Sequence, residues 1–521
     1  MSQAAPPIIW SIAGSDSAGG AGLAADQRAA DAFGAHLCPV VAAVTAQNSR
    51  AVIRVEPVPP EWLDAQLAAL ADDLPPAAVK TGLLGGAAHI AAVARWIDRL
   101  RQRAPVALVV DPVLAASTGA AFADDAALAA YRDLLLPRAT LATPNRREAE
   151  RLAAAPGAAA PAPALAAALR IAGTRAVAVT GGDDDAAAAF ALDWIDTPHA
   201  SGWLALPRIA TPHAHGTGCT FATSAASALA LGFVPADALV LAKMATAHAL
   251  AHGHAAGQGA GPVAARAGFA AQPDLLPVMS WGEDALLPPS PSGGGQGWGL
   301  PSDLGLYAIV DSAERVRQVA AAGARAVQLR IKAPPDPATL RQAVSQALAA
   351  CRAAGATLVV NDHWRLAAEL GASAVHLGQE DLAALGATGR AELAASGLRL
   401  GISSHSLWEL CRARALRPWY IACGPVWPTL TKAMPWLPQG LDNLAWWARM
   451  AGSPVVAIGG ILEPAQLTEA ARAGASGLCV VRGLGADPAQ TLPRWQTALA
   501  EGRAAPPLPA PALPHPTLRE G

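Results

Sequence analysis

The stretch from His215 to Thr220, with the sequence HGTGCT, combines the residue types that bind a phosphate group. It precedes a run of small, helix-forming residues at 221–231. Glycines and threonines at a helix start offer accessible backbone N–H groups, hydroxyl donors and the positive end of the helix dipole. A tight turn capped by Thr220 is the structural alternative, so the other polar residues of this half must decide between the two.

A glycine-rich loop and two acidic residues accompany this stretch in the first half of the chain. The loop at 14–22, GSDSAGGAG, lets a substrate approach the backbone, and Asp26 follows it. Asp111 ends an apolar run that predicts a strand, where a carboxylate can lie near a metal ion or a phosphate. Because Pro112 follows, Asp111 also suits a simple turn.

A second group of polar residues predicts the metal–phosphate end of the same site. Asn145 and Glu148 are three residues apart at a predicted helix start, where they can organise waters around Mg²⁺. The same spacing also suits a helix cap. Thr180 and Gly182 end another predicted strand. Because these residues follow strands in this order, we interpret them as parts of one phosphoryl-transfer site.

The remaining motifs of the first half do not favour another cofactor. The sequence has no GxxxxGK[ST] motif, which excludes a P-loop NTPase. Residues 20–25, GAGLAA, fit a loose dinucleotide-binding fingerprint, but the TAQN segment at 45–48 supplies no acidic residue for a ribose. His248, His252 and His254 lie at a predicted helix end without a nearby acidic or cysteine partner, which favours dipole contacts over a metal site.

The second half of the chain places charged and polar residues where predicted parallel strands end. Gln328, Arg330 and Lys332 alternate along one strand and therefore share a side. Asp362 and Asp381 follow the next two strands, and carboxylates on adjacent strand ends can share a Mg²⁺. The later strands are followed by Ser403, Thr429, Thr431, Lys432, Gly460 and Arg482. Cations that converge on one rim in this way can surround a diphosphate.

The elements that must position these residues predict two α/β bodies. In the first, apolar runs at 8–13, 40–44, 107–110, 141–143 and 176–180 alternate with Ala/Leu-rich helical stretches, which predicts an α/β/α sandwich with helices on both faces of a sheet. In the second, eight strands that are each followed by a loop and a helix predict a closed (β/α)₈ TIM barrel. These eight strands are expected at 306–310, 326–331, 357–360, 374–377, 398–402, 420–423, 454–458 and 478–481.

Composition sets the domain boundaries and the cellular setting. We expect the first body at 1–282, a flexible linker at 283–303, the barrel at 304–503 and a disordered, proline-rich tail at 504–521. A net charge of −2 argues against a nucleic-acid partner, and no apolar run is long enough for a membrane span. The start lacks the basic region of a secretory signal and the cysteines are scattered, so we expect a cytoplasmic protein that acts on small molecules. The sequence leaves the oligomeric state open and allows a homo-oligomer.

Residues 8–265 closely resemble the hydroxymethylpyrimidine/phosphomethylpyrimidine kinases, ATP-dependent enzymes of the ribokinase-like superfamily. The segments that carry the resemblance are AGSDSAGGAG at 13–22, TAQN at 45–48, TPN at 143–145, HGTGCT at 215–220 and GAGP at 259–262. The resemblance implies that Gln47 hydrogen-bonds an aminopyrimidine, with Gly20 and Asp26 nearby. It also implies that Asn145 and Glu148 serve the Mg²⁺–phosphate region. From their places at strand ends we add Asp111 as a metal ligand and Thr180 and Gly182 as nucleotide contacts.

The same resemblance assigns the stretch that opens the helix. Gly216, Thr217 and Gly218 would form the anion hole, and Cys219 would lie beside the hydroxymethyl oxygen, where superfamily relatives carry an aspartate base. A thiol at a helix N-terminus is expected to have a lowered pKa and to polarise that hydroxyl. Family members often have a lysine where Thr180 stands, so this chain lacks one phosphate partner there.

Residues 304–485 resemble thiamine phosphate synthases through the segments QLRIK, VND, HLGQED, GISSHS, GPVWPTLTK, AIGGI and VVRGL. By that likeness Asp362 and Asp381 hold Mg²⁺, and Gln328 and Ser403 contact a pyrimidine. The groups that would bind and expel diphosphate or hold a thiazole phosphate are Arg330, Lys332, Asn361, Thr429, Thr431, Lys432, Gly460, Val481 and Arg482. The expected chemistry is loss of diphosphate under cationic stabilisation, followed by capture of the pyrimidine-methyl cation by a thiazole nitrogen.

The two halves would then catalyse consecutive steps of thiamine biosynthesis. The first would phosphorylate 4-amino-5-hydroxymethyl-2-methylpyrimidine twice, and the second would condense the diphosphate with thiazole phosphate to give thiamine phosphate. The alternatives are a pyridoxal-type vitamin kinase, a thiazole tautomerase-like barrel and a pyrimidine-sensing protein without catalysis. A tautomerase has no diphosphate to bind and a sensor needs no metal site, so the residues favour the kinase and the synthase.

Overall fold

The computed structural model describes residues 5–115, 122–153, 160–182, 189–284, 304–333, 336–429 and 435–518. The chain divides into two compact units: unit 1 comprises Met1–Pro288 with Glu520–Gly521, and unit 2 comprises Pro289–Arg519. Nearly all of the predicted linker at 283–303 lies outside the described residues. Among those described, no helix has the length and apolar character needed to cross a membrane.

Unit 1 is built on a sheet with the strand order β10-β9-β8-β7-β6-β5-β4-β1-β2-β3. The strands from β7 to β2 in that order pair in parallel, whereas β3 and β8–β10 pair antiparallel toward the two edges. The strands are β1 Ile8–Ser15, β2 His36–Gln47, β3 Val52–Pro57, β4 Ala78–Thr81, β5 Ala107–Val110, β6 Leu141–Ala142, β7 Val177–Thr180, β8 Phe190–Asp196, β9 Ser201–Pro207 and β10 Val278–Met279.

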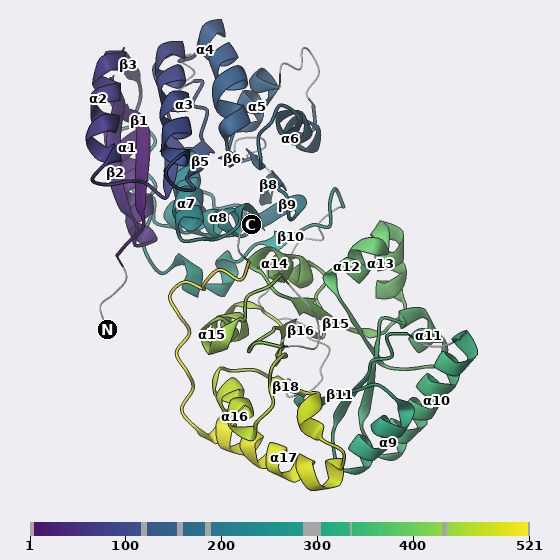
Figure 1. Cartoon of the computed structure of the whole chain (residues 1–521). Coiled ribbons are helices and arrows are strands. Elements are labelled where there is room, and N and C mark those ends of the chain that lie inside the picture. Colours follow the sequence, from purple (N-terminus) through teal and green to yellow (C-terminus); the bar gives the residue numbers. More distant parts are fainter. Residues whose placement is uncertain are drawn as a thin grey trace. The chain divides into compact units, whose positions relative to one another are not determined.

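Helices lie on both faces of this sheet, which confirms the α/β/α sandwich (Figure 1). One face carries α1, α7 and α8, and the other carries α2, α3, α4 and α6. Their bounds are α1 Gly22–Ala32, α2 Pro60–Ala71, α3 Ala87–Arg101, α4 Asp125–Ala130, η1 Tyr131–Leu135, η2 Leu136–Arg138, α5 Arg146–Leu152, α6 Ala162–Ile171, α7 Thr217–Ala230, α8 Pro235–Ala251, η3 Phe269–Ala271 and η4 Pro273–Leu275.

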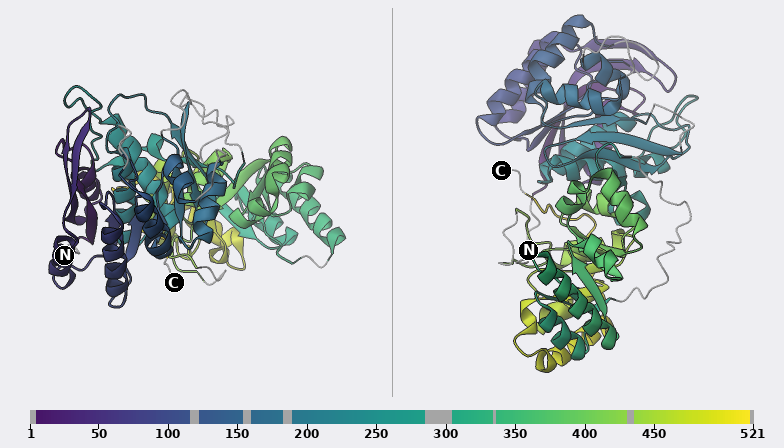
Figure 2. Two further views of the ribbon diagram at one scale, coloured as in Figure 1. Left: turned by 90° about the horizontal axis from the view of Figure 1, so that it is seen from above. Right: turned by 90° about the vertical axis from the view of Figure 1, so that its right-hand side faces the viewer.

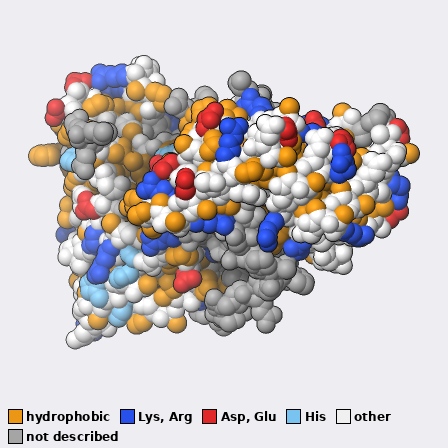
Figure 3. Space-filling view, turned by 90° about the horizontal axis from the view of Figure 1, so that it is seen from below, with side chains coloured by type: hydrophobic (Ala, Val, Ile, Leu, Met, Phe, Trp, Pro, Cys, Tyr) orange, Lys and Arg blue, Asp and Glu red, His pale blue; other side chains and the backbone are white. Residues whose placement is uncertain are grey.

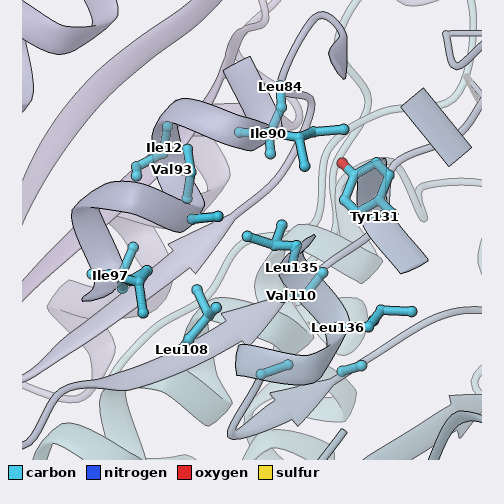
Figure 4. Packing of buried hydrophobic residues seen from close by; sticks show 14 of the residues in the cluster. Ile12, Leu84, Ile90, Val93, Ile97, Leu108, Val110, Tyr131, Leu135 and Leu136 are labelled. Carbon is cyan, nitrogen blue, oxygen red and sulfur yellow. The ribbon is translucent and has the colours of Figure 1, made fainter. Parts of the chain in front are cut away.

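The apolar core of unit 1 lies between the sheet and α3. Ile12 and Val110 project from β1 and β5, Val93 projects from α3, and Tyr131 and Leu135 from η1 close the cluster (Figure 4). Because strand residues alternate between faces, the neighbours of these core residues point to the opposite face, toward α1 and α7. That second face carries the polar residues of the site.

Unit 2 is a closed barrel of eight parallel strands with helices on its outside, which confirms the TIM barrel (Figure 2). The strands are β11 Gly305–Val310, β12 Ala326–Leu329, β13 Thr357–Asn361, β14 Ala374–Leu377, β15 Arg399–Ser404, β16 Tyr420–Cys423, β17 Val455–Ala457 and β18 Gly477–Val480. The helices are α9 Ala313–Ala321, α10 Pro337–Ala353, α11 Trp364–Glu369, α12 Gln379–Ala384, α13 Gly386–Ala395, α14 Leu407–Ala415, α15 Gly440–Met450, α16 Pro464–Arg472, η5 Arg482–Leu484 and α17 Pro488–Ala504.

The prediction that the proline-rich tail from residue 504 is disordered is wrong as far as residue 518. His515 N–H donates to Asn443 Oδ1 at 2.9 Å, and Asn443 Nδ2 donates to His515 O at 3.0 Å. Leu437 N–H donates to the carbonyl of Thr517 at 2.7 Å, and Thr517 is 2% exposed. Prolines have few conformations to lose, so the cost of ordering such a segment is small and these contacts offset it.

Candidate active sites

The N-terminus of α7 meets the glycine-rich loop of unit 1, as the phosphate-site prediction requires. Gly216 caps the helix with φ +86°, and a Cβ there would lie 2.2 Å from the carbonyl oxygen of Gly20. Only glycine allows this approach. Gly218 is exposed, and no atom lies within 4 Å of the position its Cβ would take. Thr217 donates its hydroxyl to Ala214 O at 2.5 Å, so the turn offers backbone N–H groups rather than this hydroxyl.

A buried cluster of three charges lies beneath this turn. Lys80, at the end of β4, places its Nζ 3.1 and 3.2 Å from the two oxygens of Asp26, and 3.4 Å from Asp111 Oδ2. Ser11 and Thr223 donate their hydroxyls to Asp26 at 2.6 and 2.7 Å. Lys80 and Asp26 are 0% exposed. A polar cluster this deeply buried is stable only because each charge has partners.

This cluster corrects the role predicted for Asp26 and adds a partner to Asp111. Asp26 was expected to contact substrate, but its carboxylate is fully enclosed and bound by Lys80, Ser11 and Thr223. Asp111 was expected to hold a metal ion; it faces Lys80, and burial together with Asp26 raises its pKa despite that cation, so its metal role stays a prediction. Both carboxylates therefore hold Lys80 in place.

Cys219, in the first turn of α7, has the opposite pKa shift to the one predicted. Burial raises the pKa of its thiol to about 12, and the charges of Asp26 and Asp111 add to that effect while Lys80 opposes it. The helix dipole is outweighed because burial removes the sulfur from water, while the attraction of Lys80 is opposed by Asp26 and Asp111. The thiol is therefore protonated at neutral pH and can donate or orient a hydrogen bond.

Gln47 lies at the end of β2, where its side chain meets two residues of the neighbouring loops. Its Nε2 is 3.3 Å from His215 Nε2, and the same ring nitrogen is 3.1 Å from Asp16 Oδ2. Asp16 also accepts the N–H groups of Gly20 and Ala21 at 2.9 and 2.8 Å. Burial would raise the pKa of Asp16, but these hydrogen bonds lower it below its usual value. The Gln47 amide is thus held beside the α7 turn.

Asn145 and Glu148 form a capping box at the start of α5. Asn145 Oδ1 accepts the N–H of Glu148, and Glu148 Oε2 accepts the N–H of Asn145, both at 3.0 Å. The backbone of Asn145 is paired with Thr180 at the end of β7, so these two predicted residues are neighbours. Beyond Thr180, Arg208 Nη1 donates to Gly182 O at 2.8 Å. The cap uses the amide oxygen of Asn145 and one carboxylate oxygen of Glu148, so fewer oxygens of these two residues remain for a metal ion than predicted.

The rim of the barrel brings the two predicted metal ligands together. Partial burial and then the charge of Asp381 raise the pKa of Asp362, while His363, Arg330 and Lys332 oppose the shift. Asp362 is held at φ +65°, a conformation in which Asn and Asp are the usual non-glycine residues. Asp381 Oδ2 accepts the N–H of Gly378 at 2.9 Å. No group of three or more acidic, histidine or cysteine ligands occurs among the described residues, but two repelling carboxylates beside two cations fit a Mg²⁺ that carries a diphosphate.

The predicted pyrimidine contacts lie deeper inside the barrel. Gln328 on β12 and Asn361 on β13 are 2% and 5% exposed, whereas Ser403 on β15 is half-buried. Gly460 has φ +75°, and a Cβ there would lie 2.5 Å from the Cβ of Trp427, so the loops after β16 and β17 touch. Val481 and Arg482 are exposed after β18, and Thr429 is half-buried. Thr431 and Lys432 lie outside the described residues.

The sequence interpretation missed Lys80, His215 and the buried polar residues of the barrel. Lys80 lies in Ala78–Thr81, a four-residue strand too short to predict by periodicity. His215 was seen only as the start of the phosphate turn. Tyr307, Tyr420 and His376 lie on predicted strands, where aromatic residues read as ordinary core. The signals that could have revealed these residues were a lysine, a histidine and two tyrosines at strand positions that face the interior.

Comparisons with known proteins follow the same division. Residues 16–264 match the phosphomethylpyrimidine kinase family, and residues 306–484 match the thiamine monophosphate synthase family. A hydroxymethylpyrimidine/phosphomethylpyrimidine kinase of Synechococcus elongatus is 42% identical over 262 residues, which cover 50% of this chain and 97% of that protein. A thiamine-phosphate synthase of Rhizobium etli is 51% identical over 159 residues, 30% of this chain and 74% of that protein.

A phosphomethylpyrimidine kinase sandwich and a thiamine monophosphate synthase barrel in one chain define a bifunctional enzyme with a kinase and a transferase domain. A probable thiamine biosynthetic bifunctional enzyme of Oryza sativa subsp. japonica, named as chloroplastic, is 34% identical over 479 residues, which cover 87% of this chain and 81% of that protein. The chain belongs to this family of bifunctional thiamine biosynthetic enzymes, with phosphomethylpyrimidine kinase and thiamine-phosphate synthase domains.

Proposed function

We propose that unit 1 transfers phosphate from ATP to 4-amino-5-hydroxymethyl-2-methylpyrimidine and then to the resulting monophosphate. The backbone N–H groups at the start of α7 can hold the transferred phosphate, and Gln47 lies beside them to orient the pyrimidine. Because the Cys219 thiol keeps its proton, its role is to orient the hydroxymethyl oxygen. Positioning and charge neutralisation then supply most of the rate, as is usual in phosphoryl transfer.

In unit 2 we propose that the product of unit 1 loses diphosphate. Asp362 and Asp381 would hold a Mg²⁺, which would neutralise charge on the diphosphate when bound. Arg330 lies close enough to lower the pKa of Asp362, and with Lys332 it can stabilise the departing oxygens. The bond between the methylene carbon and oxygen breaks with its electron pair on the diphosphate. The lone pair of the thiazole nitrogen then forms the new bond to that carbon.

The observation that carries the proposal is the chemistry of the barrel rim. The pKa of Asp362 is raised by partial burial and by the charge of Asp381, and two carboxylates in this position next to Arg330 and Lys332 fit a metal-bound diphosphate. An isomerase acting on a thiazole phosphate releases no diphosphate and has no use for this arrangement. The measurement that separates the two is release of inorganic diphosphate from the aminopyrimidine diphosphate, which we expect and which a tautomerase cannot give.

The substrate of unit 1 is tested by comparing aminopyrimidine and pyridoxal under the same conditions with MgATP. We expect kcat/KM for hydroxymethylpyrimidine to exceed that for pyridoxal by about 10²-fold or more, because Gln47 can pair with an aminopyrimidine edge. Comparable values for the two, or a preference for pyridoxal, would contradict the assignment.

Small-molecule substrates remain the only partners that we propose. On the face that Figure 3 shows, Lys and Arg are interspersed with Asp and Glu and form no single basic patch. The absence of a nucleic-acid partner stays a prediction from the net charge of −2. The cytoplasmic location stays a prediction, since the rice relative is named as chloroplastic.

A further inference from the structure

A chain of hydrogen bonds crosses the interior of the barrel and joins the two predicted pyrimidine contacts. Gln328 Nε2 donates to the Tyr307 hydroxyl at 3.3 Å, and this hydroxyl is 2.8 Å from that of Tyr420. The Tyr420 hydroxyl is 2.9 Å from His376 Nδ1, and Nε2 of the same ring is 2.9 Å from Ser403 Oγ. The five side chains come from five different strands, β12, β11, β16, β14 and β15.

The surrounding barrel is shaped to hold this chain. Tyr307 and Tyr420 are each 1% exposed and His376 is 8% exposed. The Tyr420 ring fills the space beside Gly401, where a Cβ would lie 2.2 Å from Tyr420 Cζ. Apolar side chains of the same size would fill a barrel core without polar groups that need partners. The hydroxyls and the imidazole therefore serve a purpose other than packing.

The groups of this hydrogen-bond chain must all donate in the same direction along it. His376 is buried and its two ring nitrogens face the Tyr420 and Ser403 hydroxyls, an environment that favours the neutral ring with a single N–H. With Gln328 as donor, Tyr307 donates to Tyr420, Tyr420 donates to His376 Nδ1, and Nε2–H donates to Ser403. The Ser403 hydroxyl can then donate to a ligand, and the Gln328 carbonyl oxygen can accept from one. Reversing the chain would exchange both roles together.

We propose that this chain sets the donor–acceptor order of the pyrimidine pocket and makes the synthase selective for a 4-aminopyrimidine over its 4-oxo analogue. The amino group donates and the neighbouring ring nitrogen accepts, which matches an accepting Gln328 and a donating Ser403. A 4-oxo ring presents an accepting oxygen beside a ring N–H, the opposite order. Binding it would require the Gln328 amide to rotate and the His376 proton to move to the other nitrogen. Tyr307, Tyr420 and His376 are thus positioning residues; this inference rests on the proposed function of unit 2.

The experiment compares kcat/KM of the full-length chain for the 4-amino and 4-oxo pyrimidine diphosphates, with thiazole phosphate and Mg²⁺. We expect the wild type to prefer the amino compound by about 10²-fold or more. In Tyr420→Phe and in Tyr307→Phe this ratio should fall by about tenfold, mainly through a lower kcat/KM for the amino compound. The affinity for inorganic diphosphate with Mg²⁺ should stay at the wild-type value. Tyr131→Phe removes the hydroxyl of a buried tyrosine in unit 1 and should leave the ratio unchanged.

The outcomes separate the inference from the function on which it rests. An unchanged ratio in both variants overturns the inference. An equal loss of kcat/KM for the two compounds does so too, because either result would give the hydrogen-bond chain a structural role only. If Tyr420→Phe loses diphosphate binding through misfolding, Tyr307→Phe, which removes a different oxygen, decides the matter by the same ratio. If the wild type forms a thiamine phosphate from neither diphosphate, the proposed function fails and the inference fails with it.

Discussion

At the scale of single residues, the kinase site depends on charges that no ligand can touch. Lys80 is enclosed by Asp26 and Asp111, and all three groups act on the Cys219 thiol: Lys80 lowers its pKa and the two carboxylates raise it. Burial, together with the two carboxylates, disfavours a thiolate even at a helix N-terminus, where the dipole would favour one. Cys219 is therefore a neutral hydrogen-bonding group, and the backbone N–H groups around it carry the anion-binding role.

Replacing Cys219 with alanine should lower kcat for phosphorylation of hydroxymethylpyrimidine by about 10²-fold, because the hydroxymethyl oxygen loses the group that orients it. The dissociation constant for the pyrimidine should stay within about twofold of the wild type, since Gln47 is untouched. A titration of the pyrimidine and a steady-state kinase assay measure the two quantities. An unchanged kcat would show that the thiol has no part in the reaction.

The pH dependence of the same reaction follows from the pKa of Cys219, which burial raises to about 12. Because the thiol stays protonated well below that value, raising the pH from 7 to 9 forms almost no thiolate. Log kcat for the wild-type kinase should therefore be flat between pH 7 and 9, and iodoacetamide should modify Cys219 slowly over that range. A tenfold rise in kcat that disappears in the alanine variant would contradict this.

Asp362→Asn should abolish most synthase activity while the fold stays intact. Asparagine tolerates the positive φ of +65° that this position requires, so the backbone need not change. Removing one of two proposed metal ligands should lower kcat/KM for thiamine phosphate formation by about 10²-fold or more and weaken its dependence on Mg²⁺. Kinase activity serves as the internal control and should equal that of the wild type.

Motif spacing could predict which residues meet at each site but not how far each is buried. Gln47, Gly20 and the α7 turn, and likewise Asp362 and Asp381, come together as predicted. The burial of Asp26 and its pairing with Lys80 could not be predicted because Lys80 lies on a strand of four residues. In the sequence, Asn145 and Glu148 fit both a helix cap and a metal site; the structure shows the cap, and their metal role stays a prediction.

At the scale of elements, the start of α7 owes its function to the close approach of two loops. Gly216 leaves room for the Gly20 carbonyl, and His215 packs against Gly20, where a Cβ would lie 2.3 Å from the histidine ring. Glycine is therefore required both at Gly20 and at Gly216. Neither loop can hold a side chain there without moving the other.

Two glycine-to-alanine variants distinguish a structural role from a catalytic role in this turn. Gly216→Ala should destabilise unit 1 by about 2 kcal/mol or more, because it adds a positive-φ penalty to a clash with the Gly20 backbone. Gly218→Ala should fold like the wild type, since no atom lies within 4 Å of the added methyl group, but should slow phosphoryl transfer by crowding the phosphate. Denaturant unfolding and kinase assays measure these effects. Equal stability of the two variants would show that the approach of the loops is not needed.

At the scale of the whole molecule, each unit has its own sheet or barrel, its own core and its own candidate site. The regular period of eight strands and helices made the barrel predictable nearly to the residue, with β14 and β16 matching their expected ranges. The sandwich was harder to predict, because β3 and β8–β10 are antiparallel additions that alternation with helices does not reveal. The tail was misjudged because composition does not report the surface that a segment can pack on.

Independent sites predict that the activities complement each other between chains. A mixture of the Cys219→Ala and Asp362→Asn chains should form thiamine phosphate from hydroxymethylpyrimidine, each chain supplying the step that the other lacks. In the wild type, added unlabelled pyrimidine diphosphate should dilute the label from hydroxymethylpyrimidine in the product. A mixture that stays inactive, or a label that resists dilution, would indicate that the intermediate passes directly between the units.

The central claim is that one chain loads two phosphates onto an aminopyrimidine and then expels them together. It is tested most directly by incubating the full-length protein with hydroxymethylpyrimidine, MgATP and thiazole phosphate and counting every phosphorus-containing product. We predict two ADP and one inorganic diphosphate for each thiamine phosphate formed. Pyrimidine phosphates that accumulate without thiamine phosphate, or one ADP for each thiamine phosphate, would contradict the account.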